Sequence, residues 1–264
     1  MPAVRWETLR REAQALAAHA HDPAAFDAAW GEVLERYADR TFRPGREAEV
    51  PRLPGYHLPP ALLLGLWQGL RAHLNSRPAL ALPLAEALWA RPDLESRLMA
   101  ARLLGLASVQ PPEPVLRRFW DWLAAAPTPD VAAALLEHGT VRLVEEASRP
   151  YLEAVGNMLA GEADAALGLR ALIPLLEAPQ FENLPRVLRF LAPLLSPPDP
   201  ALRPELAAVL RVIARRWPEE ALPFLRSLWR THPDATLAWL LRRLLAVLPP
   251  ETAQTLKALL AEGR

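Results

Sequence analysis

The sequence predicts an all-α protein, a right-handed α-solenoid built from helical-pair repeats. The first indication is that apolar residues follow helical spacing almost everywhere. Between residues 201 and 217, one such stripe comprises Leu202, Leu206, Val209, Leu210, Ile213 and Trp217. Alternating β-branched runs, which indicate strands, do not occur in the sequence.

Proline punctuation is the second indication. Proline makes up 29 of the 264 residues, about twice its usual share of roughly 5%. Most prolines stand where helices begin, because the missing N–H costs little there. Pro218, Pro233 and Pro249 are 15 and 16 residues apart, which is close to half a helical-pair repeat. Helices this short bury their apolar faces by stacking on neighbours, so we expect about six to seven helical pairs of HEAT or armadillo type.

The expected helices follow from these stripes and breaks. Asp22, Asn183 and Asp199 precede helix starts and are predicted caps. Prolines within the apolar pattern, such as Pro174 and Pro193, are expected to kink or shorten their helices. The predicted ranges are 4–20, 23–38, 59–74, 78–90, 93–108, 113–126, 129–137, 140–147, 150–160, 163–177, 184–195, 201–216, 219–231, 234–247 and 250–262.

We divide the chain into three segments. Residues 1–40 form an N-terminal helical hairpin, residues 41–60 a proline-rich loop, and residues 61–264 a repeat array that is continuous with the hairpin as one structural unit. The loop loses apolar periodicity and is interpreted as a connector. Its alternative interpretation is a lid or contact loop that carries Tyr56 and His57.

Composition excludes several classes of protein. Lysine and arginine balance aspartate and glutamate at 30 each, so the net charge provides no general attraction to nucleic acid or membrane. The absence of cysteine excludes disulfides and thiolate sites. We find no secretory leader and no apolar run long enough to span a membrane. We therefore expect a cytoplasmic protein without membrane partners.

Motifs for catalysis or cofactors are missing from the sequence. No HExxH, GxGxxG, GxxxxGK[ST] or GxSxG pattern occurs. His19 and His21 lie near Asp22 but form no ligand set of the usual spacing. We therefore predict no metal, no cofactor and no small-molecule active site. Gly65 and Gly69 share a helix face, which favours close helix packing.

Charge is distributed unevenly along the chain. Residues 130–164 contain seven acids and two arginines, whereas residues 165–243 contain eleven arginines and seven acids. Arg211 with Arg215, and Arg226 with Arg230, are spaced to form positive stripes on helices. Any attraction for an anionic partner is therefore expected in the C-terminal half.

Two tryptophans accompany arginines in helical positions. Trp239 falls off the apolar stripe of its helix, next to Arg242 and Arg243, and Trp120 stands in RRFWDWL. Arginine and tryptophan together suit a surface that follows phosphates and stacks on bases. The same residues also suit packing between repeats, and both interpretations stay open.

Three stretches carry a family resemblance: ALWARPDLESRLMAARLLG, ADAALGLRALIPLL and PELAAVLRVIARRWPEEALPFLRSL. Together they resemble the HEAT-repeat DNA alkylation-repair glycosylases, over roughly residues 78–248. The resemblance implies a basic concave groove that holds damaged duplex DNA. It also implies a Trp, an Asp and an Arg around the lesion, with a carboxylate that stabilises charge on the sugar.

Arg170 matches the groove arginine by position, and Asp130 is the candidate for the aspartate. The stretch TPDVAAALLEHGTVRLVEE contains no tryptophan, and Ala207 and Ala208 stand where a groove aromatic is expected. The resemblance therefore implies a member with eroded catalytic residues.

Two hypotheses remain. The first is a non-catalytic scaffold that binds a protein partner on its concave face. The second is a DNA-binding relative of the glycosylases, which binds duplex DNA on its basic C-terminal half. The candidate binding residues are Arg170, Arg211, Arg215, Trp239, Arg242, Arg243 and Trp120.

Overall fold

The protein is all-α wherever its structure is described. A computed structural model describes residues 6–41, 53–161 and 165–262, and these ranges contain helices, turns and one isolated bridge but no strand. They fall into two compact units, Met1–Ala147 and Ser148–Arg264. The predicted division into hairpin, loop and array stays a prediction, and most of the loop, residues 42–52, lies outside the described residues.

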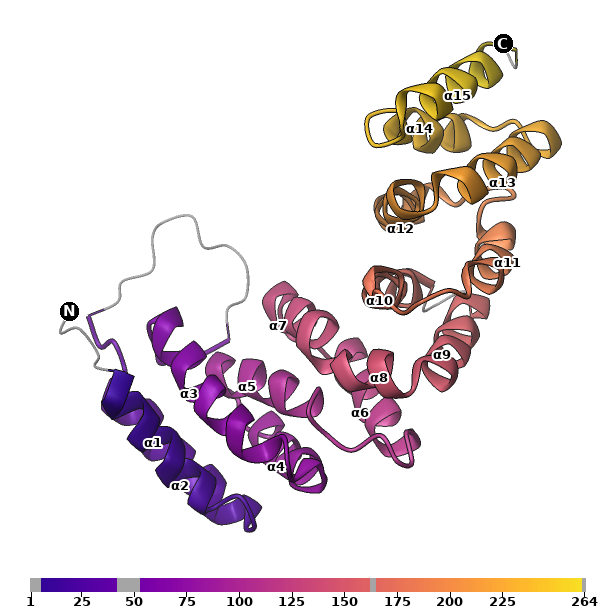
Figure 1. Ribbon diagram of the computed structural model, residues 1–264. Coiled ribbons are helices and arrows are strands. Elements are labelled where there is room, and N and C mark those ends of the chain that lie inside the picture. The colour runs from indigo at the N-terminus through magenta and orange to yellow at the C-terminus, as the bar shows by residue number, and fades with distance from the viewer. Residues whose placement is uncertain (1–5, 42–52, 162–164, 263–264) are drawn as a thin grey trace. The chain divides into compact units, whose positions relative to one another are not determined.

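The first unit consists of two rows of helices (Figure 1). One row contains α1, α3, α5 and α7, and the other contains α2, α4 and α6. The bounds are α1 Trp6–Ala18, α2 Pro23–Tyr37, α3 Pro60–Leu74, α4 Ala81–Trp89, α5 Leu94–Leu104, α6 Glu113–Ala124, α7 Pro129–Ala134 and α8 Val141–Glu146.

The second unit repeats this pattern. Helices α10, α12 and α14 stack in one row, and α9, α11 and α13 form a second row beside it (Figure 1). Helix α15 packs against α13 and α14. The bounds are α9 Ser148–Ala160, α10 Ala165–Glu177, α11 Leu184–Leu194, α12 Arg203–Arg216, α13 Pro218–Thr231, α14 Ala235–Leu244 and α15 Pro250–Glu262.

Caps and prolines set the helix starts. Asp22 accepts hydrogen bonds from the backbone N–H groups of Ala24 and Ala25, as predicted. Asp199 caps the short 3₁₀ turn before α12 through the N–H of Ala201. Asn183 occupies the N-cap position of α11, as predicted, but its side chain makes no cap bond. The proline at the second position of α11 explains why one cap donor is missing there.

Close packing of α1 on α3 explains the GLWQG glycines. A Cβ on Gly69 would lie 2.3 Å from the Cβ of Ala13, and one on Gly65 would lie 2.7 Å from Leu9 Cδ1. The two helices therefore approach more closely than any larger residue would permit. The expectation of close helix packing at these glycines is confirmed.

A π-helical turn interrupts the helix that the sequence predicts over residues 129–137. The α7 helix ends at Ala134, and residues 135–139 form a π-helical turn that packs on α5. A Cβ on Gly105 would lie 1.8 Å from the carbonyl oxygen of His138. The extra residue of the π-turn therefore lies where the end of α5 contacts the backbone of residue 138. The spacing of apolar residues along α7 does not encode such a contact.

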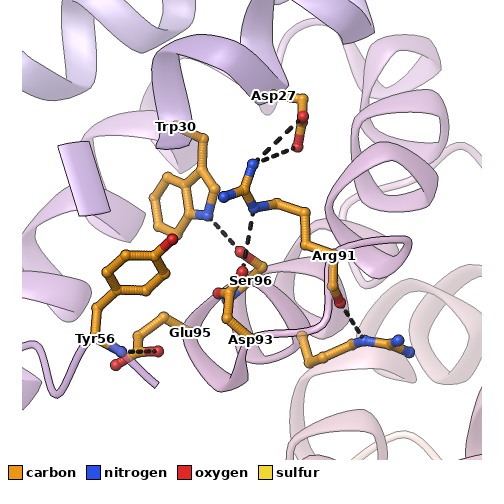
Figure 2. Close-up of polar contacts among 8 residues, drawn as sticks. Asp27, Trp30, Tyr56, Arg91, Asp93, Glu95 and Ser96 are labelled. Carbon is orange, nitrogen blue, oxygen red and sulfur yellow. Dashed lines mark hydrogen bonds and ion pairs between the residues drawn. The ribbon is translucent and has the colours of Figure 1, made fainter. Parts of the chain in front are cut away.

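A buried polar cluster joins α2, α5 and the segment before α3 (Figure 2). Trp30 Nε1 donates to Ser96 Oγ over 2.8 Å, and the Asp93 carboxylate accepts from Ser96 N over 2.9 Å and from Arg91 Nε over 3.2 Å. Glu95, only 5% exposed, accepts from the backbone N–H groups of Tyr56 and Leu58. Since each carboxylate is matched by donors, this cluster stabilises the first unit and fixes residues 56–58.

Candidate nucleic-acid interface

The row of α10, α12 and α14 carries most of the positive charge of the second unit. These three helices contain seven arginines and two glutamates, whereas α9, α11, α13 and α15 contain five arginines, one lysine and five glutamates. The predicted candidates Arg170, Arg211, Arg215, Arg242 and Arg243 all lie on this row and all are exposed. We call the exposed side of these three helices the basic row face.

Helical spacing explains why α12 presents arginines on this face. Leu206, Val209, Leu210 and Ile213 are buried, and they leave Arg211 and Arg215 on the opposite side one turn apart. The second predicted stripe, Arg226 with Arg230, lies on α13 in the other row. The two stripes therefore belong to different sides of the unit, although they are close in sequence.

Two ion pairs join α10 to α12 on the basic row face. Arg170 pairs with Glu205 at 3.2 Å, and Arg215 pairs with Glu177 at 3.4 Å. Arg170 in the middle of α10 reaches the first turn of α12, and Glu177 at the end of α10 reaches the last turn of α12, so the two helices run in the same direction. The side chains of Arg170 and Arg215 are 45% and 64% exposed, so each pair contributes about 1 kcal/mol or less to stability.

Trp239 lies between two guanidinium groups. The Arg243 guanidinium is 4.5 Å from the Trp239 ring centroid, and that of Arg203 is 5.9 Å away. Arg203 also donates to Thr236 Oγ1 over 2.7 Å. Trp239 is part-buried, beside the fully buried Leu240 and Leu241. The indole therefore orients two arginines, which suits phosphate contact better than stacking on a base.

Arg211 and Arg242 complete the face. Both are exposed, and no described carboxylate lies within ion-pair distance of either guanidinium. With Arg243 held on Trp239, the face presents three guanidinium groups that are not neutralised by acids. Such groups bind phosphate oxygens and release counterions, which makes the affinity depend on salt.

The remaining candidates lie in the first unit. Asp130 is exposed at the second position of α7, where its charge suits a helix N-terminus. Trp120 is part-buried on α6 and meets Phe119 edge-on, with ring centroids 5.0 Å apart. The described contacts of Trp120 are those of packing, and this residue does not lie on the basic row face.

Sequence reasoning missed Arg203 and Arg216. Arg203 contacts Thr236 of α14, which is 33 residues further along the chain. This separation is about the length of one repeat. Arg216 donates to the carbonyl oxygens of Leu176, Ala178 and Pro179 at the end of α10. A search for arginines one repeat away from a helix end would have found both.

Among the residues that the structure describes, no group of three or more His, Cys, Asp or Glu side chains is placed to hold a metal ion. No helix within the described ranges is long and apolar enough to cross a membrane.

Comparison with known proteins gives one match. A family model described as "DNA alkylation repair enzyme" matches residues 66–243, more than half of the chain. No curated protein and no solved structure matches the chain. The matched range contains α4 to α13, most of α3 and nearly all of α14, and thus the arginines of the basic row face.

Proposed function

We propose that this chain, which belongs to the DNA alkylation repair enzyme family, binds duplex DNA through the basic row face and acts in the repair of alkylated DNA. The observation that carries the proposal is the charge difference between the two rows of the second unit, with seven arginines against two glutamates on α10, α12 and α14. Family membership favours this function over the protein scaffold that the net charge of zero suggested.

The finer architecture is part of the proposal. Paired helices in two rows within each unit support a right-handed α-solenoid of HEAT or armadillo type. In such an array, the helices of one row form a continuous surface that can follow a duplex. Arg211, Arg242 and Arg243 would contact backbone phosphates, which position a duplex without reading its sequence.

We propose binding without base excision. Arg170, the candidate for the groove arginine, already pairs with Glu205, and residues 128–146 contain no tryptophan. Asp130 belongs to the first unit and Arg170 to the second. Incubating the protein with a methylated duplex and measuring released base tests this part, since release above the protein-free rate would contradict it.

The binding test compares two double variants of the same charge change. Arg242→Glu with Arg243→Glu alters the basic row face, whereas Arg226→Glu with Arg230→Glu alters α13 in the other row. A fluorescent duplex is titrated at two salt concentrations, and circular dichroism verifies folding. We expect the α14 variant to bind at least about tenfold more weakly and to lose about two units of salt slope.

The α13 variant is expected to stay close to the unaltered protein. Equal losses in both variants would mean that binding follows net charge rather than the basic row face. An absence of salt-dependent binding in the unaltered protein would overturn the proposed function itself.

A further inference from the structure

Three basic side chains converge at one edge of the first unit. Arg77 NH1 lies 3.4 Å from His21 Nε2 and 3.3 Å from His73 Nε2. His21 belongs to the turn between α1 and α2, and His73 to the last turn of α3. Three segments thus bring a guanidinium and two imidazole nitrogens to one point of the first unit.

The donor inventory limits how these groups can bond. A guanidinium group only donates hydrogen bonds, so an imidazole that bonds to Arg77 accepts through Nε2. Among the described ion pairs, no carboxylate joins any of the three side chains. If either imidazole were protonated at Nε2, its N–H would face an N–H of the Arg77 guanidinium, and two positive charges would lie side by side. An anion between the two groups would accept hydrogen bonds from both.

The neighbouring charged groups do not provide that anion. Asp22 accepts the two N–H groups that it caps at the start of α2 through Oδ1, and no described ion pair joins its carboxylate to His21, His73 or Arg77. Arg142 of α8 donates to the carbonyl oxygen of Asn75 and pairs with Glu146. His19 and Arg71, each two residues before one of the two histidines, are the next basic residues in the sequence.

We propose that His21, His73 and Arg77 form a binding site for a phosphate group. Phosphate oxygens would accept hydrogen bonds from Arg77 and from both imidazoles, whose Nε2 atoms donate when they carry a proton. The guanidinium excludes a metal ion at the same point, because it is a fixed positive charge without a lone pair. This proposal is independent of the proposed function.

The test uses the full chain and inorganic phosphate. Imidazole ¹⁵N signals are followed by NMR during a phosphate titration at one fixed pH. Chloride keeps the ionic strength equal. We expect the signals of His21 and His73 to move together and to saturate.

Two variants make the test specific. Arg77→Gln is expected to weaken phosphate binding about tenfold, because it removes one charged hydrogen-bond donor. Arg40→Gln is the matched control, since Arg40 is also an exposed arginine of the first unit but pairs with Glu35. The proposal is overturned if phosphate moves the two signals no more than chloride does, or if both variants titrate alike.

A second arm identifies the source of the phosphate. If Arg77→Gln weakens binding of inorganic phosphate and of a duplex, this edge contacts the DNA backbone. If only inorganic phosphate is affected, the ligand is a free phosphate or a phosphomonoester. Loss of duplex binding in the α14 variant with an unchanged phosphate titration would separate this site from the basic row face.

Discussion

Arg215 and Arg216 are neighbours in sequence with different roles. Arg215 is exposed, and it forms one surface ion pair with Glu177. Arg216 is part-buried and donates to three carbonyl oxygens at the end of α10, over 2.5 to 2.8 Å. Terminal carbonyls of a helix have no partner within it, and a cation there also suits the helix dipole. Arg216 therefore holds α10 against α12.

Removing Arg216 is expected to destabilise the protein. Arg216→Met should lower the free energy of unfolding by about 2 kcal/mol, because charged hydrogen bonds to otherwise unpaired carbonyls are lost. Arg215→Met, one residue away, should change it by about 0.5 kcal/mol or less. Urea denaturation measures both, and equal effects in the two variants would contradict the cap role.

His138 gives the stability a dependence on pH. Burial and the positive charge of Arg102 lower the pKa of His138, and Glu137 opposes them. The unfolded chain therefore takes up a proton near pH 6.5, where the folded protein does not. Stability should fall as the pH decreases below that value.

His138→Gln removes this proton uptake. Its free energy of unfolding should fall less between about pH 6.5 and pH 5 than that of the unaltered protein. Chemical denaturation across this range provides the comparison. Identical pH slopes in both proteins would show that other groups cause the dependence.

At the scale of helices, the sequence predicted most of the architecture. Apolar stripes and proline starts are local properties, and α2, α3, α13 and α15 begin and end within one residue of their predicted bounds. Pro174 lies inside α10, and that helix continues three residues further to Glu177. The proline was expected to kink or shorten the helix, and the helix is not shortened.

Features that depend on contacts between helices were not predictable in this way. In the π-turn after α7, the backbone of His138 contacts Gly105, and these two residues are 33 positions apart in the sequence. For the candidate site, the sequence predicted which arginines are exposed on α10, α12 and α14. Their partners Glu205, Glu177 and Thr236 were not, because these contacts join helices about one repeat apart.

Gly105→Ala tests the contact between α5 and the π-turn. A Cβ at this position would overlap a carbonyl oxygen, and a backbone group cannot turn away as a side chain can. We expect a loss of about 3 kcal/mol or more in the free energy of unfolding. Gly161→Ala, whose Cβ would lie no closer than 3.6 Å to any atom, is the control with little effect.

At the scale of the whole molecule, a net charge of zero conceals a local excess. Arginines gather on one row of the second unit, and the two glutamates of that row are paired with Arg170 and Arg215. The field that an approaching duplex meets therefore depends on which row it approaches, since salt screens charges beyond roughly 10 Å. Glu177 and Glu205 limit the charge of the basic row face.

Neutralising these two glutamates should strengthen DNA binding. Glu177→Gln with Glu205→Gln keeps acceptor oxygens for Arg215 and Arg170 but frees two positive charges on the face. We expect the Kd for a duplex to fall about fivefold at low salt and the salt slope to increase. Glu219→Gln with Glu220→Gln on α13 changes the net charge equally in the other row. If both variants tightened binding alike, the net charge of the molecule would govern its affinity for DNA, and the basic row face would lose its special role.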